Sequence, residues 1–233
     1  MSALARNGCT GFTMDVDSEK CTLLIFAKAP VPGAVKTRMQ PFLDVRQSAL
    51  LHQNLVEHCL ATATGVSGMN LELCVGGHHD WWEDIREKYS LAITHQVGAD
   101  LGQRMCNAAG DCLDAGGALA IGGVKQRSVI IIGTDCPYMD SEYLQQASAA
   151  LTDHDVVLGP ANDGGYVLIG FKSLYSWLFC DVDWGSDRVL AQTRRKLVDH
   201  GISWYELPFL SDIDRPEDLR ALKNEMPELL FGI

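Results

Sequence analysis

Short apolar runs alternate along this chain with segments whose apolar residues recur at helical spacing. Residues 23–27 and 129–132 are apolar without interruption, which is typical of strands buried on both faces of a parallel sheet. Residues 44–64 carry apolar side chains three or four positions apart and end before Gly65, so they predict a helix. The pattern therefore indicates that strands and helices follow one another along the chain.

The same reasoning locates the remaining elements. Strands are expected at residues 71–75, 91–94, 155–158, 166–171 and 202–207, and helices at residues 80–88, 101–112, 141–151, 186–200 and 215–224. Strands that alternate with helices predict an α/β protein in which helices cover both faces of the sheet.

The domain organisation is expected to be simple, because no internal repeat or clear domain boundary is visible. We expect a single domain over residues 20–233, preceded by a flexible extension over residues 1–19. The glycine-rich residues 116–123 predict a loop or a weak linker.

Composition narrows the class of protein. The chain has 233 residues, 47% of them hydrophobic and 21% charged, which suits a globular protein with a sizeable core. The 30 acidic residues outnumber the 19 basic ones, for a formal charge of −11. Because a non-specific nucleic-acid binder needs a basic face, this balance argues against a nucleic-acid partner.

Cysteine usage and hydropathy indicate where the protein is located. The eight cysteines form no CxxC motif and no Cys/His spacing typical of zinc, so they fit scattered thiols in a reducing cytoplasm. The N-terminus lacks the apolar core of a secretory signal. No stretch of about 18 apolar residues occurs, so no membrane span is expected.

The first predicted loop concentrates positive charge. Ligands of open α/β sheets bind outside the carboxyl ends of the strands, and this loop follows the first strand. It carries Lys28, Lys36 and Arg38 in an otherwise acidic chain. Its prolines and Gly33 shape a loop whose backbone N–H groups can face an anion. The three cations are candidates for neutralising phosphate charge, and solvated surface cations are the alternative.

Acidic residues follow two other predicted strands. Asp135 comes directly after the apolar strand at residues 129–132 and is a candidate ligand for Mg²⁺ or Mn²⁺, which prefer oxygen. The alternative is that Asp135 caps the next turn or helix. Asp212 and Asp214 follow the last strand, and one of them is a candidate for a second metal carboxylate.

A third loop joins two predicted strands through Asn162, Asp163, Gly164 and Gly165. This segment is first of all a turn signal. Its glycines also let the backbone approach a ligand closely, and Asp163 is a candidate for binding a sugar hydroxyl or acting as a base.

Two weaker candidates complete the predicted ligand edge. Residues 96–104 join a strand to a helix and are candidates for contacts with a base or ribose. Trp184 and Ser186 lie among acidic residues, a setting suited to packing on a sugar, although a packing role for Trp184 in the protein is equally compatible.

Six of these segments, taken together, resemble one bacterial family. They are, in order, FAKAPVPGAVKTRM, QVGADLGQRM, IIIGTDCPYM, VLGPANDGGYVLIG, VDWGSDRVL and SDIDRPEDL. Over roughly residues 21 to 222 the chain resembles the GT-A-type glycosyltransferase-like family labelled radical-SAM/selenodomain-associated transferase or arsenosugar biosynthesis glycosyltransferase. The resemblance implies a three-layer, Rossmann-like GT-A nucleotide-diphospho-sugar transferase fold with a mostly parallel central sheet.

Motifs and resemblance together assign roles to particular residues. Nucleotide or phosphate binding is expected of Ala27, Lys28, Pro30, Gly33, Lys36, Arg38, Gln96, Asp100 and Arg104. The resemblance implies Mg²⁺ or Mn²⁺ bound by Asp135 and Asp214. The substrate side is expected to comprise Asp163, Gly164, Gly165, Trp184 and Ser186, and Lys36 and Asp163 are the expected catalytic residues.

We therefore expect a metal-dependent transferase that moves a glycosyl group from a nucleotide-diphospho-sugar to a small acceptor. Many GT-A glycosyltransferases carry an Asp-x-Asp pair, whereas here Asp135 stands alone after the strand. This departure favours the alternative of a nucleotidyltransferase that moves an NMP from an NTP to a phosphorylated acceptor. A nucleotide-binding protein without turnover is the second alternative. A homodimer is compatible with the sequence.

Overall fold

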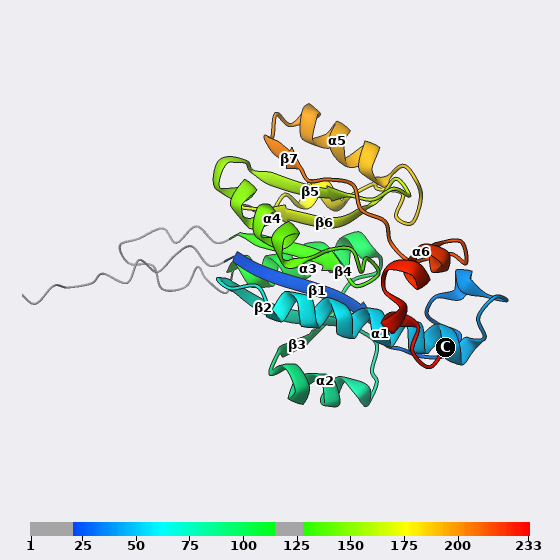
Figure 1. Ribbon diagram of the computed structural model, residues 1–233. Helices are drawn as coiled ribbons and strands as arrows, with labels where there is room; N and C mark the ends of the chain where they lie inside the picture. The colour runs from blue at the N-terminus through cyan, green and yellow to red at the C-terminus, as the bar shows by residue number, and fades with distance from the viewer. Residues whose placement is uncertain (1–20, 115–127) are drawn as a thin grey trace, which may run out of the picture.

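A computed structural model describes residues 21–114 and 128–233 of the protein. These residues form a seven-stranded sheet in the order β3-β2-β1-β4-β6-β5-β7 (Figure 1). The strands are β1 (Cys21–Lys28), β2 (Met69–Gly76), β3 (Ala92–His95), β4 (Val129–Gly133), β5 (Val156–Pro160), β6 (Tyr166–Phe171) and β7 (Trp204–Glu206). Only β6 runs antiparallel to its neighbours β4 and β5, so the predicted mostly parallel sheet is confirmed.

Helices follow the strands as predicted. They are α1 (Val45–Thr64), α2 (Trp81–Tyr89), α3 (Leu101–Asp114), α4 (Ser141–Asp153), α5 (Val189–Asp199) and α6 (Asp218–Glu225), with short 3-10 helices η1 (Thr37–Met39), η3 (Ser176–Phe179) and η4 (Pro227–Leu230). Among the described residues, no helix is long and apolar enough to cross a membrane. The expectations for residues 1–19 and 116–123 lie outside the described residues.

Most element boundaries lie within two residues of the prediction, and the starts of α5 and α6 differ more. Helix α5 begins at Val189 rather than 186, because residues 183–186 close a turn in which Ser186 N donates to Asp183 O at 3.1 Å. Helix α6 begins at Asp218 rather than 215, because the Asp218 carboxylate accepts the backbone N–H groups of Asp214 and Arg215 and holds them in a turn. Strand β7 is shorter than the predicted residues 202–207.

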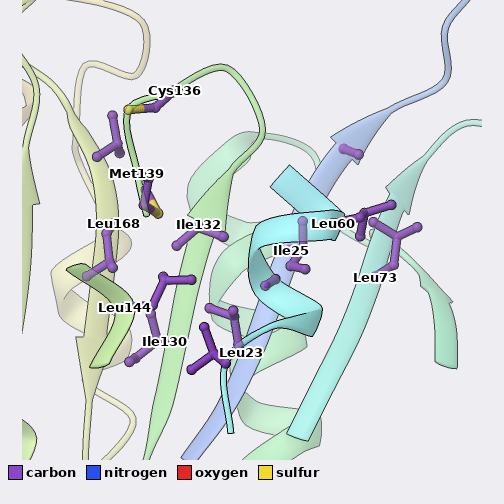
Figure 2. Close-up of a cluster of buried hydrophobic side chains, with 14 of the residues drawn as sticks. Leu23, Ile25, Leu60, Leu73, Ile130, Ile132, Cys136, Met139, Leu144 and Leu168 are labelled. Carbon is purple, nitrogen blue, oxygen red and sulfur yellow. The ribbon is translucent and has the colours of Figure 1, made fainter. Parts of the chain in front are cut away.

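The side chains of the central strands alternate between two core layers. Leu23 and Ile25 of β1 pack with Leu60 of α1 on one face of the sheet (Figure 2). Leu24 points to the other face, where it joins Met105 of α3. Because both faces are covered, β1 and β4 are apolar at almost every position. This explains why these two strands are the easiest to recognise from the sequence.

A third core cluster lies at the carboxyl end of the sheet. It joins Met39 of the first loop, Leu55 of α1, Ile213 after β7 and Leu222 of α6. Figure 1 shows the first loop and α6 together at this end of the molecule. The cluster therefore brings two segments that are far apart in the sequence to the edge where β1 and β4 end.

Close packing of α3 requires a glycine at its first turn. A Cβ at Gly102 would lie 2.6 Å from Phe179 O and 2.6 Å from Trp184 Nε1. A Cβ at Gly110 of the same helix would meet nothing nearer than Leu174 Cδ2 at 3.4 Å. Helix α3 therefore has room for a side chain at Gly110 and none at Gly102.

We predict opposite effects for alanine at these two glycines. Gly110→Ala should stabilise the protein by about 0.5–1 kcal/mol through helix propensity. Gly102→Ala should destabilise it by about 1–2 kcal/mol, because overpacking outweighs the same gain. Urea unfolding measures both free energies, and equal effects of the two variants would contradict the packing described here.

Candidate active site

The site is organised around an ion pair between the first loop and the end of β4. Lys36 Nζ lies 2.7 Å from Asp135 Oδ1 and also donates to the backbone carbonyl of Ile213 at 2.5 Å. Only 2% of the Lys36 side chain is exposed, against 49% for Asp135. The backbone is held as well, since Ile213 N donates to Asp135 O at 2.8 Å. Lys36 thus joins three separate chain segments through one buried ammonium group.

Charge fixes the ionisation state of Asp135. Burial acts to raise its pKa, but the positive charge of Lys36, the hydrogen bond from Lys36 and the positive charge of Lys28 outweigh burial and hold the pKa below its ordinary value. The carboxylate is therefore ionised at neutral pH. Burial raises the pKa of the adjacent Cys136 thiol to about 12, so that thiol is not a nucleophile at neutral pH.

His52 of α1 lies beside Asp135 in the protein interior, a neighbour that the sequence did not indicate. Its Nδ1 lies 3.9 Å from Asp135 Oδ1, and its Nε2 lies 2.9 Å from the backbone oxygen of Lys28. Burial lowers the pKa of His52, so the ring is neutral at neutral pH and donates from Nε2 to that carbonyl. A histidine on the apolar face of a predicted helix gave no signal in the sequence, because a core position explains it equally well.

A second ion pair joins Arg38 to Asp214, with Arg38 Nη1 at 2.6 Å from Asp214 Oδ2. Both groups are partly solvent-exposed, and the Arg38 cation lies at the surface whereas the Lys36 cation is buried. The turn described above, in which Asp218 holds the backbone of Asp214, keeps this carboxylate in place.

Three carboxylates line one small cavity of about 170 Å³, which we call the acidic cavity. They are Asp135, Asp163 and Asp212, which come from three different loops at the carboxyl edge. Burial and the nearby negative charge of Asp163 raise the pKa of Asp212 to about 6. Position after the last strand leaves Asp212 and Asp214 as alternatives, and the resemblance implies Asp214. Asp212 lines the acidic cavity with Asp135, and it also lines a neighbouring cavity with Asp214 and Arg38, which Asp135 does not line.

A second cavity of about 230 Å³ adjoins the first and is called the apolar cavity. It is lined by Phe26, Leu101, Met105, Ile131, Ile132, Gly133, Asp163, Gly165, Tyr166, Val167, Ile169, Trp184, Gly185, Ser186 and Val189. Five of these residues, Gly133, Asp163, Gly165, Tyr166 and Val167, also line the acidic cavity. The predicted substrate-side residues Asp163, Gly165, Trp184 and Ser186 therefore converge on this cavity.

Gly164 locks the turn between β5 and β6 against the start of α5. Its φ is +89°, and a Cβ there would lie 2.2 Å from Asp187 O. Leu190 N donates to Gly164 O at 2.9 Å, and Gly165 N donates to Asp163 Oδ1 at 2.8 Å. These bonds hold Asp163 at the boundary between the two cavities.

Several residues predicted to bind nucleotide form hydrogen bonds within the protein. Gln96 Nε2 donates to Cys74 O at 2.8 Å and to Ala27 O at 3.3 Å. Arg104 Nε donates to a backbone oxygen, that of Gly98, at 3.1 Å. Asp100 caps the start of α3, where its side chain accepts the backbone N–H of Gln103. Pro30 is buried, whereas Lys28 and Gly33 are exposed beside the end of β1.

The carboxylates fit a divalent cation only in part. Within residues 21–114 and 128–233, no three His, Cys, Asp or Glu side chains are grouped closely enough to hold a metal ion by themselves. Mg²⁺ characteristically takes one or two carboxylates and completes its shell with water and substrate phosphates. Asp135, with Asp212 in the same cavity, matches that ligand set.

Comparisons with known proteins identify the fold and the family. The chain is similar to a solved structure from Desulfovibrio desulfuricans G20 named "putative nucleotide-diphospho-sugar transferase", with 30% identity, a TM-score of 0.78, and coverage of 88% of this chain and 89% of that one. The fold is therefore that of the nucleotide-diphospho-sugar transferases, as the sequence resemblance implied. A family model described as "Uncharacterized protein conserved in bacteria (DUF2064)" matches residues 59–186, and the chain belongs to this family.

More distant structures share the fold alone. The chain is similar to 4-diphosphocytidyl-2C-methyl-D-erythritol synthase from Anaerococcus prevotii DSM 20548, at 14% identity and a TM-score of 0.56 over 90% of this chain and 99% of that one. It is also similar to CMP:2-keto-3-deoxy-manno-octonic acid synthetase solved with CTP, at 10% identity and a TM-score of 0.55 over the same shares. No curated protein matches the sequence.

Replacing the buried lysine tests the ion pair. Lys36→Met should destabilise the protein by about 2–3 kcal/mol at neutral pH, because it leaves Asp135 and the carbonyl of Ile213 without their donor. The pKa of Asp135 is depressed, so the pair contributes stability above about pH 4 and loses it as the pH falls through the folded pKa. Urea unfolding should therefore show a smaller difference in unfolding free energy between the wild type and Lys36→Met at acidic pH than at neutral pH.

The matched control is Lys88→Met, which breaks a surface ion pair with Glu57. It should cost less than about 1 kcal/mol. Equal losses for the two variants would mean that Lys36 is no more important than a solvated lysine.

Replacing Asp212 by Asn removes a carboxyl whose pKa is raised by folding. Such a group binds its proton more tightly in the folded chain, so its stabilising contribution is complete below about pH 4 and is lost as the pH rises to 6. With EDTA present, the variant should be more stable than the wild type at neutral pH, by up to about 3 kcal/mol. The advantage should disappear near pH 4. Urea unfolding at both pH values measures this, and an advantage independent of pH would contradict the assignment.

Proposed function

We propose that this protein is a metal-dependent transferase that moves a glycosyl group from a nucleotide-diphospho-sugar to a small acceptor. The observation that carries the proposal is the acidic cavity, where Asp135, Asp163 and Asp212 meet at the carboxyl edge of the sheet. In α/β sheets of this kind, that edge is where ligands bind. The 30% identity to the Desulfovibrio protein, named for a nucleotide-diphospho-sugar substrate, supports the same class of donor.

The donor's diphosphate would lie between the acidic cavity and the cations of the first loop. Arg38 is partly exposed and presents a planar guanidinium group, and Lys28 is exposed at the end of β1. Lys36 is buried against Asp135, so its contribution is to hold that carboxylate in place and ionised. Arg38 and Lys28 are thus the groups available to neutralise phosphate charge.

Asp135 would hold Mg²⁺ or Mn²⁺ together with phosphate oxygens of the donor, with Asp212 or Asp214 as the second carboxylate. When bound, such an ion neutralises charge on the leaving diphosphate. The raised pKa of Asp212 is consistent with this role, because a cation in the acidic cavity would relieve the repulsion between its carboxylates.

Asp163 would orient or deprotonate the acceptor hydroxyl. It lines both cavities, so it can contact a group that bridges them. Its Oδ1 accepts a hydrogen bond from Gly165 N, which fixes the orientation of the carboxylate. Asp163 therefore has the position that a general base requires.

Nucleotidyl transfer is the second candidate. Asp135 stands alone after β4, without the Asp-x-Asp pair of many GT-A glycosyltransferases. In that reaction an NTP would supply the NMP and release pyrophosphate. We place either activity in the cytoplasm, since Cys21, Cys74 and Cys136 are buried free thiols that suit a reducing compartment.

A thermal-shift screen with nucleotide sugars and NTPs, with and without Mn²⁺, tests the proposal. A bound donor at about 100 times its Kd should stabilise the fold by about 2.7 kcal/mol, or roughly 5–10 °C in Tm. The shift should require Mn²⁺ and be lost in Asp135→Asn. The exposed Asp84→Asn on α2 is the matched control and should keep it.

The outcomes separate the candidates. Stabilisation by nucleotide sugars and not by NTPs supports glycosyl transfer. Stabilisation by an NTP, with pyrophosphate released when a phosphorylated acceptor is added, supports nucleotidyl transfer and overturns glycosyl transfer. No metal-dependent shift with any nucleotide would contradict both activities.

A further inference from the structure

The apolar cavity differs in chemistry from the acidic cavity beside it. The walls that belong to it alone are mainly hydrocarbon, from Phe26, Met105, Ile131, Ile169 and Val189. None of the described residues that line it is a lysine, arginine or histidine. A diphosphate needs cations, so it does not belong in this cavity.

A hexose does not fit these walls either. Each hydroxyl placed against hydrocarbon loses its hydrogen bonds to water without replacement, which disfavours binding. The acidic cavity, by contrast, is polar, and a carboxylate oxygen of Asp163 or Asp212 that does not contact the cation can accept a hydrogen bond from a sugar hydroxyl. The sugar of the donor therefore suits the acidic cavity and leaves the apolar cavity to another molecule.

We propose that the apolar cavity binds the acceptor, and that the acceptor is a small molecule with an apolar body and a hydroxyl group. This inference rests on the proposed transfer function. It adds the chemical class of the molecule that receives the transferred group, which no residue of the charged loops specifies.

The shared wall of the two cavities sets how such an acceptor would lie. Gly133, Asp163, Gly165, Tyr166 and Val167 line both cavities. A molecule whose apolar body fills the apolar cavity can reach Asp163 with its hydroxyl at the boundary. The reacting oxygen would then lie next to the cavity that takes the donor.

Aromatic packing preforms the outer wall. Trp184 meets Tyr166 edge-on, with ring centroids 6.3 Å apart and planes at 90°. Gly102 lets Trp184 approach α3 closely, because a Cβ there would overlap the indole nitrogen. Leu101, at the start of α3, is 44% exposed and forms part of the lining where the cavity meets solvent. A rigid aromatic wall suits an apolar ligand without further ordering on binding.

Calorimetric titration of the full chain with benzyl alcohol and with glucose tests the inference. Benzyl alcohol combines an apolar body with one hydroxyl, and we expect it to bind at least about tenfold more tightly than glucose. Leu101→Asp should weaken benzyl alcohol binding by about tenfold, because it places a charge against the apolar ligand. Aspartate is acceptable in the first turn of a helix, so this variant should fold, as its circular dichroism and Tm will show.

The matched control is Val97→Asp, which puts the same charge on another exposed apolar position of the preceding loop, outside the cavity lining. It should bind benzyl alcohol like the wild type. Equal binding of glucose and benzyl alcohol, no binding of either, or unchanged binding in Leu101→Asp would each overturn the inference. Displacement of benzyl alcohol by uridine would also overturn it, because the cavity would then take the nucleoside.

These results are independent of the test of function. Benzyl alcohol binding requires neither metal nor nucleotide. If the metal-dependent nucleotide shift is present and Leu101-dependent binding is absent, the acceptor class is wrong and the transferase remains. If the nucleotide shift is absent and Leu101-dependent binding is present, the transferase proposal fails while the cavity still holds a small apolar ligand.

Discussion

One buried ammonium group connects the parts of this site. Lys36 reaches from the first loop to the carboxylate of Asp135 after β4 and to the backbone of Ile213 after β7. These segments have no common element of secondary structure, and besides the lysine they are joined by apolar packing, by the hydrogen bond from Ile213 N to Asp135 O and by the Arg38–Asp214 ion pair. A buried charge is costly unless it is paired and hydrogen-bonded, and this requirement makes the geometry of the three segments mutually dependent.

The fold was largely predictable because its central strands are buried on both faces. Such strands leave long apolar runs, as in β1 and β4, and the loops after them then mark the ligand edge. The boundaries that shifted, at the starts of α5 and α6, depend on turns closed by particular side chains such as Asp218. Side-chain contacts of that kind are set by tertiary structure and do not appear as periodicity.

The site was predictable in its location and less so in its detail. Sequence spacing singled out Lys36 and Asp135, but not that they pair with each other, because a contact across 99 positions has no local signature. The choice between Asp212 and Asp214 depends on which way each side chain turns from one short loop. His52 was missed because it lies on the buried face of a helix, where a histidine resembles any other core residue.

The reversed direction of β6 has a consequence for how the site can change. Because β6 runs against β4 and β5, the two cavities are bounded on one side by a tight hairpin turn rather than by a long strand-to-helix loop. The turn is tied to the β5–β6 register and, through the hydrogen bond from Leu190 N to Gly164 O, to α5, so an insertion there would displace strand pairing as well as Asp163. Residues 183–188, which face this turn, belong to no strand and have no strand pairing to lose. Related proteins should therefore change the ligand of the apolar cavity through substitutions and insertions in residues 183–188. The β5–β6 turn on the other side should stay constant and keep Asp163 in position.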